Sequence, residues 1–156
     1  APRLDPGEVD DDNAYALGGV AGHAGLFSTA RDLSSLGAQI IEELNGADRF
    51  GAGESIRHFA QPDRGPTGPP RALGFDLIAP EGSSVGPRWG KGHTGGFGHL
   101  GFTGCALWLD LDRQLSGALL SNRVLHGREH IASIRSLRPS FFDAVITAYE
   151  TENWSD

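Results

Sequence analysis

A chain of 156 residues is long enough to form one compact domain with a hydrophobic core. Its composition is that of a globular protein, with 38% hydrophobic and 21% charged residues and no apolar run long enough to span a bilayer. The net charge of −7 and a single lysine, Lys91, leave no basic stripe for a phosphate backbone, which argues against nucleic acid as a partner. One cysteine, Cys105, cannot form an internal disulfide, so the cellular compartment stays open.

The first half of the chain predicts loops and two helices. Residues 1–13 are acidic and predict an extended or loop segment, whereas residues 16–27, ALGGVAGHAGLF, suit a backbone that packs closely against another element. A helix is predicted from Thr29, whose spacing to Asp32 is a capping-box pattern, to the stop signal at 45–46. A shorter helix is expected within GESIRHFAQP, before Pro62.

The second half carries the strand signals. Residues 62–71 are rich in proline and glycine and predict a surface connection, and the alternation in RALGFDLIAP predicts one strand over 71–80. A loop is expected at 79–96, and three further strands are expected in GHLGF, TGCALWLDL and LSGALLSNRV, with a hairpin turn at 110–114. A last helix is expected to begin with its proline in the first turn of LRPSFFDAVITAYE and to lie on the sheet.

Helices first, then antiparallel strands and a final helix indicate an α+β fold. We expect a single partial domain over 1–156, with a helical-region segment at 1–70, antiparallel strands at 71–126 and a C-terminal helix and tail at 127–156. Three or four strands with one covering helix would make a thin core for this length, so something else is expected to complete the sheet.

One segment resembles a metal-binding motif. Residues 126–130, HGREH, match the His-x-x-Glu-His pattern of the inverted zinc peptidases, in which two histidines bind zinc and the glutamate acts as base. However, Gly127 interrupts the motif, no helical periodicity surrounds it and no third ligand is identifiable. A solvated turn after the last strand explains the same residues, so we assign no metal and no cofactor.

The sequence contains no Ser-x-x-Lys nucleophile. None of its candidate hydroxyls precedes a lysine by three residues, and these are Ser28, Ser83, Ser84 and Ser121. Since Lys91 is the only lysine and position 88 is Arg88, no Ser-x-x-Lys pair exists. Cys105 lies on an apolar strand and is predicted to be a buried, inert thiol.

The stretch GHTGGFGHLGFTG, at 92–104, contains Gly-His-x-Gly twice. Such a segment can bring a side-chain donor and a bare backbone N–H to one point, as an oxyanion-binding strand requires, although a purely structural glycine loop also explains it. The second copy runs straight into Phe102 and the predicted strand pair, whereas the first is followed by further glycines. We therefore predict one strand element at 99–102 and a loop mimic at 92–95.

Four segments together resemble one family. In chain order they are NAYALGGVAGHAGLFSTARDLSSLG, ALGFDL, FGHLGFTGCALWLDLDRQLSGALLSNRV and LRPSFFDAV, within residues 9–147. They are similar to the C-terminal half of the serine β-lactamase-related hydrolases, which include class C β-lactamases, penicillin-binding-protein-like peptidases and related esterases. The resemblance implies the C-terminal part of a β-lactamase-like fold and a serine that is acylated by an amide or ester carbonyl and then released by water.

The resemblance also implies roles for single residues. The family has a nucleophile in Ser-x-x-Lys, a Tyr-x-Asn element and a third element that reads Lys-Thr-Gly or His-Thr-Gly. The segment HLG matches the third element and implies His99 as the cation or donor and Gly101 as its glycine, with the backbone N–H of Phe102 as one half of an oxyanion hole. Leu100 and Thr103 then fall at substrate-binding positions.

Three departures from the family pattern stand out. Leu100 lacks the hydroxyl that would contact a substrate carboxylate, which favours an acyl substrate unlike penicillin or a reduced activity. Asp10 stands where this branch commonly shows histidine in a Val-His-Asp segment. Neither Ser-x-x-Lys nor Tyr-x-Asn occurs, so we expect the C-terminal portion of a hydrolase that is inactive by itself.

The expected partners are a small-molecule or peptide-like acyl substrate in the full-length protein and the N-terminal portion of the same hydrolase, with a homo-oligomer as a further possibility. Two alternatives stay open. One is a degenerate, non-catalytic homologue that binds a ligand or a partner through an open sheet edge. The other is a zinc hydrolase that uses His126, Glu129 and His130.

Overall fold

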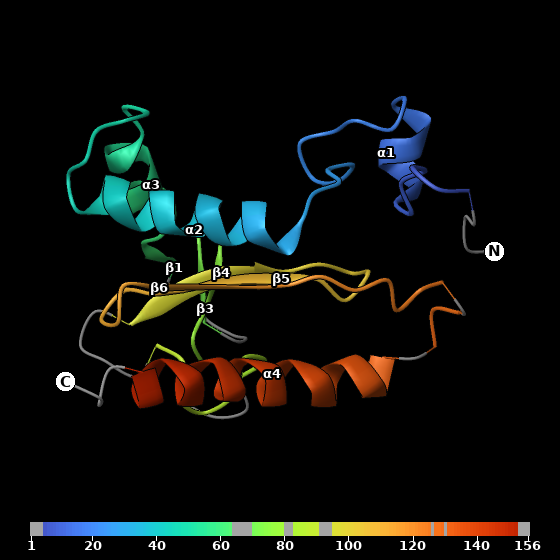
Figure 1. The fold of residues 1–156 in the computed structure, drawn as a ribbon. Helices are drawn as coiled ribbons and strands as arrows, with labels where there is room; N and C mark the ends of the chain where they lie inside the picture. Colours follow the sequence, from blue (N-terminus) through green and yellow to red (C-terminus); the bar gives the residue numbers. More distant parts are fainter. Residues whose placement is uncertain are drawn as a thin grey trace.

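The computed structural model describes residues 5–63, 70–79, 83–90, 95–125, 127–129 and 131–152. An antiparallel sheet lies between two helices, α2 (Ala30–Leu44) on one face and α4 (Ile131–Glu152) on the other (Figure 1). The short helix α1 (Asp12–Ala16) lies beyond one end of α2, and α3 (Gly53–Phe59) follows α2 at its other end. The predicted α+β class is confirmed, and so is the short helix before Pro62. No described helix combines the length and apolar character needed to cross a membrane.

The sheet is a meander whose six strands lie side by side in chain order. Its strands are β1 (Pro62–Asp63), β2 (Arg71–Ala72), β3 (Asp76–Leu77), β4 (Gly96–Leu100), β5 (Ala106–Asp110) and β6 (Leu115–Leu119). The predicted hairpin turn at 110–114 is confirmed, because Asp110 pairs with Leu115. β6 is the last strand in this order, so its outer edge pairs with no strand in the described part of the chain.

Helix α2 forms where its local signals predict it. The Thr29 hydroxyl oxygen accepts a hydrogen bond from the Asp32 N–H at 3.1 Å, and the helix ends at a C-cap on Asn45. The helix then lies directly on the sheet, since a Cβ added to Gly37 would be 2.0 Å from the Ser116 hydroxyl. On this face the core consists of Ile41, Phe97 and Leu109.

Helix α4 covers a larger core on the opposite face. Trp108 and Leu109 are neighbours on β5 and therefore face opposite sides of the sheet. The core under α4 contains Val85, Trp89, Ala106, Trp108, Phe142 and Ile146. The sheet is thus buried on both faces, and the expectation of a thin core with one covering helix is wrong, because α2 supplies the second layer.

Two predicted elements differ from the structure. Residues 71–80 do not form one strand: β2 and β3 pair with each other around a tight turn, which leaves Leu73 53% exposed. The C-terminal helix begins at Ile131, so Pro139 lies inside α4. A proline costs the helix one backbone hydrogen bond, but Ile134 and Phe142 on either side of it are buried, and this packing keeps the helix continuous.

The segment at 16–27 does not pack against another element in the described chain, contrary to our expectation. Leu17, Val20 and Leu26 expose 69%, 82% and 82% of their surface. The glycines serve a local fold instead: Gly25 has a φ of +104°, and a Cβ there would be 2.2 Å from the carbonyl oxygen of Gly19. This part of the chain therefore presents apolar side chains that no described segment covers.

Candidate functional site

The predicted oxyanion segment lies where β4 ends and turns into β5. β4 stops at Leu100. The Gly101 N–H donates to the Cys105 carbonyl at 2.7 Å, and the Gly104 N–H donates to the Gly101 carbonyl at 3.0 Å. With φ of +103° at Gly104, this is a three-residue hairpin loop, which we call the 101–105 turn. The predicted strand element at 99–102 is therefore wrong at its C-terminal end, because Phe102 lies at the tip of the turn.

His99 and Leu100 end the strand on opposite faces of the sheet. His99 pairs with Leu107, and its side chain is exposed. Leu100 pairs with Ala106 and packs, half-buried, against the core under α4. The structure thus offers a packing reason for an apolar residue at position 100.

The tip of the turn presents a backbone donor beside two cations. Phe102 is 59% exposed, and its N–H donates no hydrogen bond to any described residue. The Phe102 carbonyl accepts a hydrogen bond from Arg123 Nε at 2.7 Å. The guanidinium carbons of Arg123 and Arg128 lie 4.5 and 5.5 Å from the centre of its ring. An exposed N–H beside positive charges can donate a hydrogen bond to an oxygen that develops negative charge.

The turn also gathers one unexpected residue from the N-terminal segment. Asp10 forms an ion pair with Arg128, with 3.3 Å between the nitrogen and the carboxylate oxygen. Since Arg128 also lies over the Phe102 ring, its side chain links Asp10 to the tip of the turn. The neighbouring Asp11 caps α1, since its carboxylate accepts hydrogen bonds from the Ala14 N–H and from His23. The Ala14 N–H and His23 lower the pKa of Asp11.

Thr103, Cys105 and Ser121 tie the turn to the segment after β6. The Ser121 hydroxyl donates to the Thr103 carbonyl at 3.1 Å, and the Cys105 thiol donates to the Ser121 carbonyl at 3.3 Å. Cys105 is half-buried and lies just before β5, so the prediction of a buried thiol on the strand is wrong. These contacts explain the side chains of Ser121 and Cys105 by structure alone.

Arg138 of α4 reaches the same turn, and our reading of the sequence missed it. Only 7% of this residue is exposed. Its Nε donates to the Gly104 carbonyl at 3.2 Å, and its Nη2 donates to the carbonyls of Gly101 at 2.7 Å and Cys105 at 3.0 Å. A signal for it exists in the sequence, because Arg138 interrupts a stripe of apolar residues at four-residue spacing, Ile134, Phe142 and Ile146.

The charge of Arg138 has no carboxylate among its hydrogen-bond partners in the described chain. Burial lowers the pKa of Arg138; nearby Cys105 acts in the opposite direction, and Arg123 adds to the lowering.

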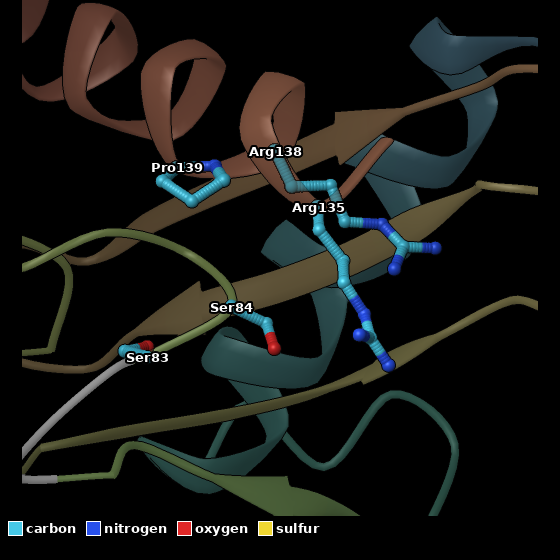
Figure 2. A pocket seen from close by; sticks show the side chains of 5 residues that line it. All are labelled: Ser83, Ser84, Arg135, Arg138 and Pro139. Carbon is cyan, nitrogen blue, oxygen red and sulfur yellow. The ribbon is translucent and has the colours of Figure 1, made fainter. Parts of the chain in front are cut away.

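A pocket of about 380 Å³ borders this side chain and is lined by Ser83, Ser84, Arg135, Arg138 and Pro139. Figure 2 shows Arg135 and Arg138 extending from α4 into this region, with Ser84 facing them from the loop.

The other predicted positions lie mainly outside the described residues. His126 and His130 of the zinc-like motif lie there, and so do His93 and Thr94 of the loop mimic. Glu129 is described and exposed. Within the described ranges, no group of three or more His, Cys, Asp or Glu side chains is placed to hold a metal ion.

Comparisons with known proteins identify one family. A family profile described as Beta-lactamase matches residues 1–137. A protein of Salmonella gallinarum named "Putative D-alanyl-D-alanine carboxypeptidase" is 32% identical over 123 residues, which cover 75% of this chain and 27% of the relative. A Salmonella typhi protein of the same name is 31% identical with the same coverage. This chain thus spans only 27% of the length of these relatives. No solved structure shows a significant match. Because the profile covers most of the sequence, the chain belongs to the β-lactamase family of serine hydrolases.

Proposed function

We propose that this chain supplies the oxyanion-binding element of a serine hydrolase that transfers acyl groups from amide or ester substrates. We further propose that the nucleophilic serine lies in a part of the hydrolase outside this sequence. The observation that carries the proposal is the N–H of Phe102, which follows the His99-Leu100-Gly101 motif, is exposed and has no acceptor among the described residues. A free backbone donor at this position is what a tetrahedral intermediate requires.

The remaining residues of the turn complete this role. The Phe102 N–H would be one donor of the oxyanion hole, and the nucleophile's own N–H would be the other. His99 would donate to the substrate or leaving group from the end of β4. Arg123 and Arg128 raise the positive potential at the tip of the turn and so favour an anionic intermediate.

Two features support the N-terminal portion of the same hydrolase as a partner. The outer edge of β6 pairs with no described strand, so it offers free backbone donors and acceptors to further strands. The exposed apolar side chains at 17–27 offer a second surface that is unfavourable in water. Completion of the domain would cover both.

Leu100 supports a proposal for the substrate class. The relatives carry the name of a D-alanyl-D-alanine carboxypeptidase, whose named substrate ends in a free carboxylate. Leu100 has no hydroxyl for that carboxylate and packs into the core, so we propose an acyl donor that is recognised without it. The complete hydrolase should therefore have a kcat/KM for the methyl ester of a D-alanyl-D-alanine peptide at least equal to that for the free carboxylate. A strong preference for the free carboxylate would contradict this assignment of the substrate.

The test of the oxyanion role separates the Phe102 N–H from the Phe102 ring. Phe102→Pro removes the N–H, and proline is favoured at the second position of a turn, so the turn should survive. We expect kcat for a chromogenic ester to fall by about 10²–10³-fold in the complete hydrolase. Phe102→Ala keeps the N–H and should retain kcat within about tenfold.

Three results would contradict the proposal. The first is equal kcat for Phe102→Pro and the parent enzyme. The second is hydrolysis of the ester by the 156-residue chain alone. The third is an equal loss of activity in His99→Ala and His93→Ala, since only His99 belongs to the proposed site. The reading frame upstream of Ala1 should also encode a Ser-x-x-Lys element.

A second candidate function is a non-catalytic partner-binding homologue. The exposed apolar residues at 17–27 favour it, because such a surface suits a protein partner as well as the missing part of a domain. If the upstream sequence lacks Ser-x-x-Lys, and sizing chromatography with mass measurement shows a stable complex with another protein, this function replaces the first.

A further inference from the structure

The proposed oxyanion donor shares one peptide group with the carbonyl that Arg138 binds. The Gly101 C=O and the Phe102 N–H belong to the same planar unit and point in opposite directions. Nη2 of Arg138 donates to this carbonyl at 2.7 Å. Whatever holds the Gly101 oxygen therefore also sets the direction of the Phe102 N–H.

The hydrogen bond also changes the strength of that donor. A bond from a guanidinium is charge-assisted, and 2.7 Å is at the short end of its range. A cation at the carbonyl oxygen draws electron density through the amide, so the N–H on its other side becomes a better donor. The two further bonds of Arg138 hold two more carbonyls of the 101–105 turn, those of Gly104 and Cys105.

Helix α4 gives Arg138 a rigid base. The residues one helical turn on either side, Ile134 and Phe142, are 4% and 0% exposed and belong to the packing between α4 and the sheet. Burial of a cation without a carboxylate partner costs free energy, as its lowered pKa also indicates. Charges retained at such a cost are typical of functional sites.

We propose that Arg138 is a positioning residue, which orients and polarises the Gly101–Phe102 peptide from α4 so that the Phe102 N–H meets the oxyanion. This inference rests on the proposed function of the 101–105 turn. Arg138 acts through the peptide and does not touch the substrate. Its loss should therefore affect the transition state more than substrate binding.

The first experiment compares Arg138→Met with Arg135→Met in the complete hydrolase. Arg135 lines the same pocket and is exposed, so its variant is the matched control. For Arg138→Met we expect kcat for an ester to fall by about 10- to 100-fold, part of the loss of an oxyanion donor, with KM changed less than about threefold. Affinity for a boronic acid, which forms a tetrahedral adduct with the serine, should fall by the same factor as kcat. Arg135→Met should keep both values within about twofold.

The pocket allows a rescue experiment. Arg138→Ala leaves a gap beside the 380 Å³ pocket, through which a guanidinium ion can reach the three carbonyls. Millimolar guanidinium chloride should raise kcat of this variant several-fold and leave the parent enzyme unchanged. Arg138→Lys keeps the charge but loses the planar fork, so it should recover only part of the activity.

Hydrogen exchange distinguishes failure of this inference from failure of the proposed function. In Arg138→Met, the amides of Gly101 and Gly104, which donate to the Cys105 and Gly101 carbonyls, should exchange at least about tenfold faster, whereas the amides of β6 should not change. If the parent enzyme transfers no acyl group, the proposed function fails, and amide exchange alone decides whether Arg138 holds the turn. Unchanged kcat in a folded Arg138→Met variant, or unchanged exchange in the turn, would overturn the inference. If that variant does not fold, Arg138→Lys decides by the same two readouts.

Discussion

Two arginines link strand β5 to helix α4, one at each end of the strand, and they are held in different ways. Arg113, next to the end of β5, pairs with Asp110 at 2.9 Å and with Glu150 of α4 at 3.1 Å. Arg138 lies on α4 and reaches the beginning of β5. Among the described residues, it donates hydrogen bonds only to carbonyls of the 101–105 turn. Arg113 is thus paired with carboxylates, whereas Arg138 is hydrogen-bonded to backbone carbonyls.

The pKa values of the two arginines shift in opposite directions. Burial opposes the charge of Arg113, but the hydrogen bonds and charges of Asp110 and Glu150 outweigh it and raise the pKa. At Arg138, burial prevails and lowers the pKa. The ion pairs at the Asp110 end of β5 therefore serve stability. At the other end of β5, Arg138 holds a backbone conformation at a cost in stability.

The largest effect on stability should come from Asp110→Ala. Asp110 is fully buried and accepts hydrogen bonds from the N–H groups of Gly90 and Arg113 as well as from the Arg113 side chain. Its loss leaves these donors unpaired, so the free energy of unfolding in urea should fall by about 3–5 kcal/mol. Asp112→Ala, at a nearby exposed position, should cost less than about 1 kcal/mol. Similar losses of unfolding free energy in both variants would show that Asp110 has no special role in stability at this end of β5.

A direct comparison of Arg113→Met and Arg138→Met comes next. Arg113→Met leaves the buried Asp110 carboxylate without its cation and should cost about 2 kcal/mol, less than a fully buried pair because the Arg113 side chain is 25% exposed. Arg138→Met removes three hydrogen bonds but also an uncompensated buried charge, so it should cost about 1 kcal/mol or less. The order for kcat should be reversed. Urea unfolding and ester hydrolysis measured on both variants would show whether stability and activity separate in this way.

Glu43 lies on the other side of the sheet and resembles Arg138 with the opposite charge, because backbone groups hold both side chains. Among the described residues, this buried carboxylate accepts only backbone hydrogen bonds, from the N–H groups of Arg49, Phe50 and Ala52. Burial acts to raise the pKa of Glu43, but the three donors together lower it. A lowered pKa contributes stability above the unfolded value of about 4.3 and loses it as the pH falls through the folded value.

The stability difference between the parent protein and Glu43→Gln should therefore be largest above about pH 5 and should shrink on acidification towards about pH 3. Urea unfolding at several pH values measures this difference. Glu42→Gln, at the exposed neighbour that pairs with Arg49, should be less destabilising at neutral pH. A constant gap for Glu43→Gln across this range would show that its charge is not the stabilising feature.

A similarly small effect on stability should come from Thr29→Ala, which serves as a reference for a purely local change. The Thr29 hydroxyl caps α2, and its removal should cost about 1 kcal/mol in urea unfolding, while Thr29→Ser should restore most of it. Neither variant should change kcat, because no hydrogen bond joins α2 to the 101–105 turn among the described residues. A fall in kcat with Thr29→Ala would show that the turn depends on general stability rather than on Arg138.

The elements predicted most accurately are those whose signals lie within a few residues. The Thr29–Asp32 spacing and the Asn45-Gly46 stop place α2 correctly, and the turn residues place the β5–β6 hairpin at 110–114. The errors fall where packing overrides local preference. Pro139 predicts the beginning of a helix, but burial of residues on both sides of it extends α4 back to Ile131. Alternation at 71–80 predicts a single strand, but β2 and β3 fold back on each other.

The sequence by itself determined the family resemblance, the α+β class and the position of the His99-Leu100-Gly101-Phe102 motif, because these depend on the order and spacing of residues along the chain. Only the tertiary structure decided that Phe102 lies at the tip of a turn and that Arg138, from 37 positions later than Gly101, holds that turn. The interruption of the apolar stripe at Arg138 signals a buried cation, but no pattern in the sequence identifies the carbonyl that it binds. The hydrogen bond exists because the packing of α4 on the sheet brings the two groups together.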